Sequence, residues 1–509
     1  MTLSRASAIL LGMASRPSPS PVAGTSRARL GSIIKTARDI MRKDAGLNGD
    51  LDRLPLLSWL LFLRAFDAEE QGRRIIEGEA FQAALSPSYQ WPTWADDERL
   101  TGEALIDFVN DKLLPYLAGL KSDTPGDPRN VLGQVFSGVR NKMASGYLFR
   151  DLVNQVRKVD FTSSDDIHTM AYLYESLLKE VRDAAGDSGE FYTPRPVIRF
   201  MAEQSFPKLG ESILDPACGT GGFLVEALTE LTEGKDIGIA DQERLWQTLR
   251  GIEKKSDPYL MCMMNLLLHG VPDPQIVHAN ALVRMLAEVG PASKVDLVLT
   301  NPPFGGEEEN SVAARFPKGY QARETAVLFV KAVIDKLKPN GRCAIVLPNG
   351  FLFDDKSRKV REDLLTKCNL HTVVRLAQGV FEPYTKIPVN LLFFDRSGPT
   401  KEVWYYQIDP PEGRKGYAKT RPMRYEEFAE CAAWWGGSDR ADRTESSSAW
   451  CVPAADIIAD NFNLDIAPPV TADDLIHRPP GELLSELIDT EREILSLLTS
   501  LQQDIASHE

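Results

Sequence analysis

Cysteine is scarce in this chain of 509 residues, and long apolar runs are missing. No Cys-x-x-Cys pair occurs, which argues against a zinc ribbon or a disulfide framework and favours reduced thiols in the cytoplasm. No apolar stretch approaches the roughly 20 residues of a membrane span, so we expect no membrane location. The six cysteines are Cys218, Cys262, Cys343, Cys368, Cys431 and Cys451.

Basic residues are outnumbered as well. The chain has 58 lysines and arginines against 72 aspartates and glutamates, a formal net charge of −14. Proteins that hold a nucleic acid unaided usually present a basic surface, because phosphate neutralisation supplies most of their non-specific affinity. Contact with DNA would therefore require a local basic groove or a partner subunit, and this charge favours the partner.

The first third of the chain divides into a tail and a helical region. Residues 1–27 are rich in serine and proline and predict a disordered tail, in which a faint likeness to a signal peptide over 5–14 is broken by Gly12. Residues 28–160 predict a helical N-terminal domain, and Leu54–Arg74 within it has the pattern of an amphipathic helix.

Residues 161–400 carry the pattern of an α/β domain. From about residue 187, short apolar strands alternate with helices, which is typical of a mostly parallel sheet wrapped by helices. In such sheets ligands bind beyond the carboxyl ends of the strands, so we expect the functional residues there. The predicted strands are Ser212–Leu214, Gly251–Ile252, Gln275–Val277, Asp296–Leu299, Cys343–Leu347, Thr372–Val374 and Asn390–Phe394.

Two further regions complete the chain. Residues 401–480 form an aromatic- and proline-rich C-terminal extension. Residues 481–509 predict a helix whose apolar side chains recur at alternating steps of three and four, as in a coiled coil. This stripe packs either on its own domain or, as its terminal position suggests, on a helix of a partner. Its members are Leu484, Leu487, Ile494, Leu498, Leu501 and Ile505.

A glycine-rich loop is the first motif with chemical meaning. Asp215–Leu224 reads Asp-Pro-Ala-Cys-Gly-Thr-Gly-Gly-Phe-Leu, follows a predicted strand and opens a predicted helix. Glycines let the backbone approach a ligand closely and leave amide N–H groups pointing at it. Asp215, at the end of the strand, can accept a hydrogen bond from an ammonium group. The pattern indicates a nucleotide-like cofactor, and the lack of a Gly-x4-Gly-Lys-Ser/Thr motif argues against a P-loop nucleotidase.

Glu253 is the second candidate, because it ends the predicted strand Gly251–Ile252. An acidic residue at that edge can bind both hydroxyls of a ribose. The alternative is a surface glutamate that precedes Lys254 and Lys255. Its separation from the glycines is larger than the roughly 20 residues expected of a dinucleotide-binding fold, which weakens a NAD interpretation.

The third motif is Asn301-Pro302-Pro303-Phe304, directly after a predicted buried strand. Two prolines fix the backbone and remove N–H donors, so the side-chain carbonyl of Asn301 and the carbonyl of Pro302 form a pair of acceptors suited to an amino group. Phe304 offers a ring on which a planar base can stack. An adenine amino nitrogen is a poor nucleophile, and two acceptors aimed at its hydrogens favour the geometry in which it attacks a sulfonium methyl. No metal is needed for this chemistry.

Asn301–Phe304 with Asp215–Leu224 resembles the amino-methyltransferases of DNA, and further segments follow one family's order. Together they resemble the modification subunit of Type I restriction–modification systems, over about residues 30–505. The resemblance implies a Rossmann-like domain that transfers methyl from S-adenosylmethionine to adenine N6. The segments are Leu56–Glu70, Gly189–Ile198, Gly251–Glu253, Met264–Gly270, Asn280–Leu282, Leu347–Gly350, Phe381–Thr385 and Asn463–Ile466.

The resemblance also assigns roles to residues. It implies that Asn301, Pro302, Pro303 and Phe304 hold a target adenine flipped out of the duplex, with Asn280 near the base. It implies that the remaining candidates line the cofactor site. These are Glu190, Phe191, Tyr192, Thr193, Pro194, Arg195, Asp215, Gly219, Thr220, Gly221, Gly222 and Glu253, with Asn280 at the edge of the same site.

The family implied by the resemblance has no DNA-reading domain of its own. It docks on a separate specificity subunit, usually two copies per specificity subunit, and a restriction/translocase subunit joins for cleavage. The segment Gly305–Arg323 either closes over DNA or is a solvated loop, and Glu307–Glu309 suggests that it points away from phosphates or orders only on assembly.

Two other hypotheses compete. Asn-Pro-Pro-aromatic motifs also suit the amino groups of glutamine or RNA, although such enzymes are commonly shorter and lack the Glu190–Arg195 segment. An inactive scaffold that only binds a specificity subunit is the non-enzymatic alternative.

Overall fold

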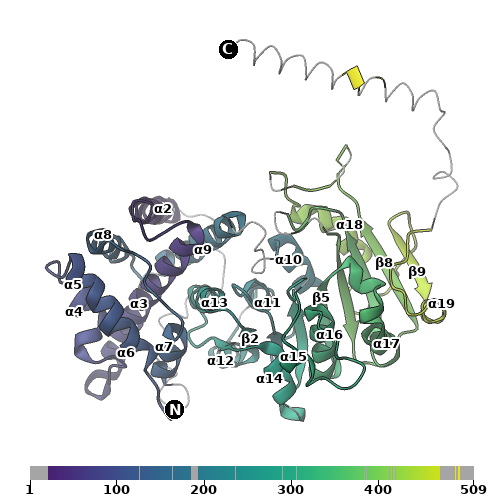
Figure 1. Ribbon diagram of the computed structural model, residues 1–509, viewed down its shortest axis with the longest axis horizontal. Coiled ribbons are helices and arrows are strands. Elements are labelled where there is room, and N and C mark those ends of the chain that lie inside the picture. The colour runs from purple at the N-terminus through teal and green to yellow at the C-terminus, as the bar shows by residue number, and fades with distance from the viewer. Residues whose placement is uncertain are drawn as a thin grey trace.

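The computed structural model describes residues 21–124, 127–162, 164–184, 193–235, 237–288, 290–304, 306–382, 385, 387–411, 413–414, 416–418, 420–469, 488 and 491–492. Figure 1 shows N-terminal helices, in purple and blue, beside a twisted sheet in green and yellow. Of the tail predicted at 1–27, residues 1–20 lie outside the described residues, as does nearly all of the predicted helix at 481–509. Residues 21–27 belong to helix α2 (Pro21–Met41), so the prediction of a disordered tail is wrong for that stretch.

Helices make up the N-terminal part. The longest is α3, in which most residues from Leu54 to Leu63 are buried. The helices are α2 (Pro21–Met41), α3 (Asp50–Glu77), α4 (Trp91–Ala95), α5 (Gly102–Asp107), the π-helix η3 (Phe108–Leu113), α6 (Leu114–Ala118), α7 (Pro128–Phe136), α8 (Gly146–Val156) and α9 (Ser164–Ala184).

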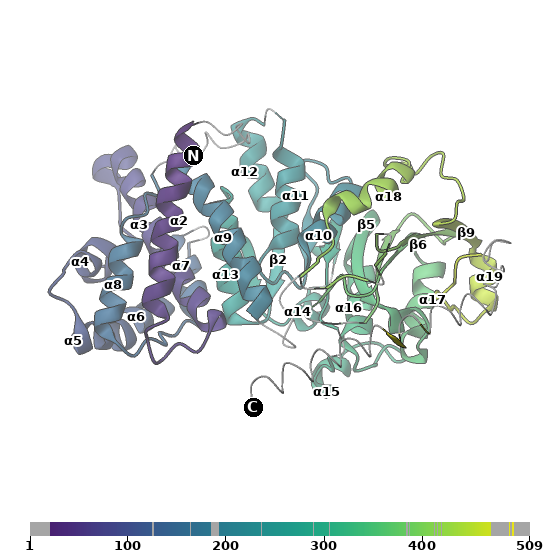
Figure 2. The same ribbon diagram turned by 90° about the horizontal axis from the view of Figure 1, so that it is seen from above.

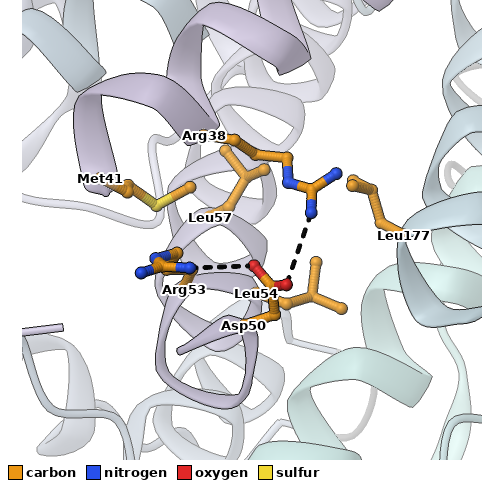
Figure 3. A pocket seen from close by; sticks show the side chains of 7 residues that line it. All are labelled: Arg38, Met41, Asp50, Arg53, Leu54, Leu57 and Leu177. Atoms are coloured by element: carbon orange, nitrogen blue, oxygen red, sulfur yellow. Dashed lines mark hydrogen bonds and ion pairs between the residues drawn. The ribbon is translucent and has the colours of Figure 1, made fainter. Parts of the chain in front are cut away.

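An ion-pair cluster joins α2 and α3 beside α9 (Figure 3). The carboxylate of Asp50, the first residue of α3, faces Arg38 at 3.5 Å and Arg53 at 3.3 Å. An acidic group at this position also interacts favourably with the helix dipole. The cavity beside the cluster measures about 10 Å³, room for one water at most, so we interpret it as structural.

A nine-stranded sheet forms the second part, in the order β3-β2-β1-β4-β5-β7-β6-β8-β9. The strands from β3 to β5 are parallel, β7 is antiparallel to β5 and β6, and β9 is antiparallel to β8. The strands are β1 (Ile213–Asp215), β2 (Leu249–Glu253), β3 (Gln275–His278), β4 (Val295–Thr300), β5 (Leu337–Pro348), β6 (Asn369–Leu376), β7 (Val389–Asp395), β8 (Glu402–Ile408) and β9 (Ala449–Pro453).

Helices cover both faces of this sheet (Figures 1 and 2). Successive residues of β4 alternate between two hydrophobic cores, with Leu297 and Leu299 in one and Val298 in the other, as the period of a strand requires. The helices are α10 (Arg195–Gln204), α11 (Gly222–Thr232), α12 (Ile239–Thr248), α13 (Ser256–Leu268), α14 (Ala281–Ala287), α15 (Asn310–Ala313), α16 (Thr325–Lys336), α17 (Arg358–Thr366), α18 (Ala429–Trp434) and α19 (Ala454–Ala459).

Helix α13 connects the two parts of the molecule. It contacts α3 and α9 on one side and the sheet on the other, and it is buried almost all round. A helix that is apolar on every face is typical of such a position between two layers. The N-terminal helices and one face of the sheet therefore share a continuous core.

The predicted fold class, an α/β domain with a mostly parallel sheet beside a helical N-terminal region, is confirmed. All seven predicted strands are present, as β1 to β7. The predicted C-terminal extension contributes β8 and β9 to the same sheet. Among the helices that the structure describes, none is long and apolar enough to cross a membrane.

Candidate active site

The predicted site residues meet at one edge of the sheet. Strands β2, β1 and β4 are parallel neighbours, so their carboxyl ends bring Glu253, Asp215 and Thr300 to the same edge. The hydroxyl of buried Thr300 donates to Asp215 Oδ1 at 2.9 Å. A hydrogen bond therefore links the residue that begins the glycine loop to the residue that precedes the Asn-Pro-Pro-Phe motif.

The glycine loop adopts a backbone that other residues would strain. Gly219 and Gly221 have φ of 52° and 82°, and Gly221 precedes the first turn of α11. A Cβ on Gly221 would lie 2.8 Å from the sulfur of Cys262, and one on Gly222 would lie 2.7 Å from Ile198. The loop thus forms a cradle packed so closely on Cys262 and Ile198 that any larger side chain would displace these supports.

Two acidic side chains stand beside the cradle. Asp215 is almost fully buried and accepts hydrogen bonds from the N–H of Ala217 at 3.1 Å and from Thr300. Burial raises its pKa to about 7 despite these hydrogen bonds. Burial also raises the pKa of Glu253, whose Oε2 accepts from the N–H of Gly219 at 2.9 Å. Both carboxylates therefore favour a cationic or hydroxyl-bearing ligand.

The segment before α10 contributes a second wall. Thr193 and Pro194 are buried, and Arg195 donates to the carbonyl of Gly222 at 3.4 Å and pairs with Glu175 of α9. Arg195 therefore connects the glycine loop to the N-terminal helices. The predicted cofactor residues Glu190, Phe191 and Tyr192 lie outside the described residues.

The side-chain amide of Asn301 has a defined orientation. Its Nδ2 donates to Oγ1 of Thr193 at 2.9 Å. Its Oδ1 is buried and has no hydrogen-bond partner among the described residues. An unpaired buried acceptor costs about 1–3 kcal/mol, so it is retained where a ligand pairs with it. Asn301, Pro303 and Phe304 are partly exposed, which leaves the motif open to a substrate.

Phe304 lies against a second aromatic ring, that of Phe381, for which no role was predicted from the sequence. Phe381, almost fully buried, lies with its ring centroid 6.0 Å from that of Phe304, at an interplanar angle of 57°. Phe381 belongs to the segment before β7, and no local pattern indicates this contact. It limits where the ring of Phe304 can turn.

Two asparagines support the site from neighbouring helices. Asn280 caps α14: its Oδ1 accepts from the N–H groups of Leu282 at 3.0 Å and Val283 at 3.4 Å, while its amide nitrogen takes no part in the cap. Asn265 of α13, fully buried, donates to the carbonyl of Thr220 at 2.9 Å and so fixes the glycine loop. Asn265 lies within the segment Met264–Gly270 that carries the family resemblance, but no sequence pattern predicted this contact.

The segment after Phe304 is anchored by a few buried side chains, although most of its described residues are exposed. Val312 and Phe316 are buried, and the hydroxyl of Tyr320 donates to Asp363 at 2.9 Å. The unusual acidic run is neutralised locally, since buried Glu308 pairs with Lys254 at 3.2 Å and Glu307 with Arg323 at 3.0 Å. An apolar stripe holds the segment on the second core, while Arg315, Lys318 and Arg323 remain exposed.

The residues present fit a particular kind of cofactor. The cradle excludes side chains, Asp215 offers an acceptor for an ammonium group, and Glu253 offers one for hydroxyls. No group of three or more metal-ligating side chains occurs in the described part of the chain. The fold and this site define an S-adenosylmethionine-dependent methyltransferase.

Comparison with known proteins identifies the family. The N-6 DNA methylase model matches residues 165–477. The chain is 45% identical over 479 residues to the methylase subunit of the type I restriction enzyme EcoEI from Escherichia coli, covering 93% of this chain and 97% of that protein.

Two solved structures agree with this match. A protein described as a modification subunit of a type I restriction enzyme from Vibrio vulnificus YJ016 is 48% identical, with a TM-score of 0.76, and the match covers 91% of this chain and 100% of that one. A chain from a structure on complex assembly and conformational transition of the type I R-M system is 36% identical, with a TM-score of 0.78, covering 95% and 99%.

The chain therefore belongs to the N-6 DNA methylase family, and within it to the modification subunits of type I restriction–modification systems. It is an adenine-specific DNA methyltransferase that uses S-adenosylmethionine. The predicted family, function, enzyme class and cofactor are confirmed.

Proposed function

We propose that the Asn301–Phe304 motif activates the amino group of an adenine that has left the DNA duplex. Oδ1 of Asn301 and the carbonyl of Pro302 accept the two amino hydrogens, and Phe304 stacks on the base. These acceptors draw the nitrogen toward the geometry in which its lone pair is free to attack. Pro303 holds the backbone of the pair.

One observation carries this proposal: Asn301 Oδ1 is buried, unpaired and held in place by the bond from Nδ2 to Thr193. A preformed acceptor of this kind needs no reorganisation when charge develops on the amino nitrogen. The nitrogen end of the amide is occupied, so the oxygen end would be the one that accepts from the substrate.

The cofactor-binding residues would act on the other side of the reacting nitrogen. Asp215 would accept from the ammonium group and Glu253 from the ribose hydroxyls, with the N–H groups of Gly219–Gly222 close to the ligand. Asn280, whose oxygen is used in capping α14, would offer its amide nitrogen to the adenine ring of the cofactor or to the target base. S-adenosylmethionine supplies a methyl group on a sulfonium.

Sequence recognition would come from a partner. The chain is acidic, at −14, so phosphate binding over a DNA site calls for a more basic subunit. We propose that this cytoplasmic chain docks on a specificity subunit, two copies for each, through its C-terminal helix, and that a restriction/translocase subunit completes the nuclease. One related structure, which concerns complex assembly of the type I R-M system, supports assembly with other subunits.

The experiment reconstitutes the chain with its specificity subunit and a duplex from the host genome. Mass spectrometry of digested nucleosides should show N6-methyladenine after incubation with S-adenosylmethionine. Methylated glutamine or RNA with unmodified DNA would favour the competing enzyme hypothesis. Cofactor binding without any methylated product would favour the inactive scaffold.

A further inference from the structure

Two large apolar side chains project into solvent at the catalytic edge of the sheet. Phe353 is 47% exposed and Ile387 is 53% exposed. Phe353 follows the end of β5, and Ile387 precedes the start of β7, where Pro348 and Val389 are paired. The N–H of Asn349 donates to the carbonyl of Pro388 at 2.9 Å, so the two loops leave the sheet side by side.

Both loops are connected to the Asn-Pro-Pro-Phe motif. Ile387 lies six residues after Phe381, whose ring contacts Phe304, and its N–H donates to Oγ1 of Thr385 at 3.0 Å. On the other side, burial and, to a lesser extent, the charge of Asp354 raise the pKa of Glu324, which forms a β-bridge with Glu307. The exposed pair thus flanks the segments that bear the adenine-binding residues.

Phe353 is held outward by a rigid support. Arg361 of α17, which is 1% exposed, donates to the carbonyls of Phe351 at 2.9 Å, Asp354 at 2.7 Å and Phe353 at 3.2 Å. The preceding Phe351 and Leu352 are fully buried. The loop therefore buries two apolar side chains and presents a third, which is not the behaviour of a loose surface turn.

The same arginine ties this loop to the C-terminal tail. Arg361 also donates to the carbonyl of Phe462 at 2.7 Å, and the N–H of Leu464 donates to the carbonyl of Leu352 at 2.9 Å. Two segments that are distant in the sequence, α17 and Phe462–Leu464, therefore hold the base of the Phe353 loop in place. Because the backbone of this loop is fixed, the side chain of Phe353 should keep its position when it contacts another molecule.

We propose that Phe353, assisted by Ile387, is a wedge that enters the base stack of duplex DNA beside the target adenine. Proteins that unstack or bend DNA insert apolar side chains between base steps, and an enzyme that modifies a base must pay for removing that base from the stack. The wedge lowers this cost by contacting the apolar faces that the departing base exposes. The inference rests on the proposed function, because it requires a flipped adenine.

The test uses Phe353→Ala in the complex with the specificity subunit, on two duplexes. One duplex has thymine opposite the target adenine, and the other has an abasic position there, which already weakens the stack. On the paired duplex the methylation rate should fall about tenfold or more, since the base must then unstack without the wedge. On the abasic duplex it should return to within about twofold of wild type, because unstacking there is already cheap.

Matched variants control for folding and for loss of apolar surface. Leu209, 42% exposed, precedes β1 and so lies at the opposite edge, and Leu209→Ala should methylate both duplexes like wild type. Phe353→Leu keeps an apolar wedge and should lose less rate than Phe353→Ala. Fluorescence of 2-aminopurine at the target position should report less flipped base for Phe353→Ala on the paired duplex.

Other outcomes overturn the wedge. Equal rates for Phe353→Ala and wild type on the paired duplex contradict it. An equal loss on both duplexes, together with weaker assembly in analytical ultracentrifugation, assigns Phe353 to a protein contact instead. If the wild-type complex methylates neither duplex, the failure lies with the proposed function and not with the wedge.

Discussion

Asn301 donates a hydrogen bond from Nδ2 to Oγ1 of Thr193, at 2.9 Å, across 108 residues of sequence. This contact joins the segment before β1 to the motif at the end of β4. Because it occupies the nitrogen of the amide, the buried oxygen is left unpaired at the site. Thr193, expected from the resemblance to be a cofactor residue, is thus in contact with the proposed catalytic asparagine.

Removal of the hydroxyl of Thr193 should slow catalysis more than it weakens cofactor binding. Thr193→Val keeps the shape and loses the acceptor, so the amide of Asn301 can rotate. We expect kcat to fall by about 10- to 100-fold, less than the roughly 100- to 1000-fold loss for a preorganised dipole removed outright, because the amide of Asn301 is still present. Thr193→Ser restores the acceptor and should recover most of the rate in a tritium-transfer assay. Equal losses for the valine and serine variants would contradict this positioning role.

A methyl group in the glycine loop should weaken cofactor binding. Gly221→Ala would adopt φ of 82° and place its Cβ 2.8 Å from the sulfur of Cys262. Strain of this kind costs on the order of 1–3 kcal/mol before any clash with the ligand. Calorimetry should show S-adenosylmethionine affinity at least tenfold weaker. Gly238→Ala, where nothing lies within 4 Å of the new Cβ, is the matched control and should bind normally.

Cofactor affinity should depend on pH through Asp215. Its pKa is raised to about 7 by burial, so the carboxylate that binds an ammonium group is lost as pH falls below 7. We expect affinity to weaken toward about tenfold for each unit below pH 7 and to level off above it. Asp215→Asn should bind weakly and remove that part of the dependence. A wild-type affinity that stays constant from pH 5.5 to 8 would exclude this role.

The same group makes a prediction about stability without cofactor. The folded pKa of about 7 exceeds the unfolded value, so protonated Asp215 stabilises the fold at low pH, and this stability is lost as pH rises through 7. Asp215→Asn cannot ionise and should therefore melt higher than wild type at pH 8, by about 2 °C or more. The difference should vanish near pH 4. Calorimetric scans at the two pH values test the sign.

DNA affinity should appear only on assembly. The chain alone, at −14, should bind a 30-base-pair duplex weakly and without sequence preference, whereas the complex with its specificity subunit should bind specifically. Fluorescence anisotropy at several salt concentrations measures both, and the slope of log affinity against log salt should steepen on assembly. Tight specific binding by the isolated chain would refute a division of labour between subunits.

The strands and the glycine loop were predictable because their signals are local. Apolar runs bounded by turn residues marked β1 to β7, and strand, glycines and helix follow one another in Asp215–Leu224. Strands β8 and β9 were not predicted, since Glu402–Ile408 mixes aromatic and polar residues and pairs in parallel with β6, over a separation that no pattern shows.

Long-range contacts were out of reach for the same reason. The bond between Thr193 and Asn301 and the burial of Arg361 depend on the tertiary fold, and a charged residue is ordinarily expected at the surface. The burial of Glu308 was also unexpected for an acidic residue. Lys254, just after β2, neutralises its charge. Asn280 was expected at the ligand, but its side-chain oxygen caps α14. An asparagine directly before a helix does signal such a cap.

The most direct test separates binding from chemistry at Asn301. Asn301→Ala removes the unpaired acceptor and leaves the glycine loop, Asp215 and Glu253 in place. In the complex with its specificity subunit, calorimetry should give S-adenosylmethionine affinity within about threefold of wild type, while tritium transfer to DNA falls by at least about 100-fold. Parallel loss of affinity and transfer, or transfer that survives the substitution, would contradict the assignment of this oxygen to the adenine amino group.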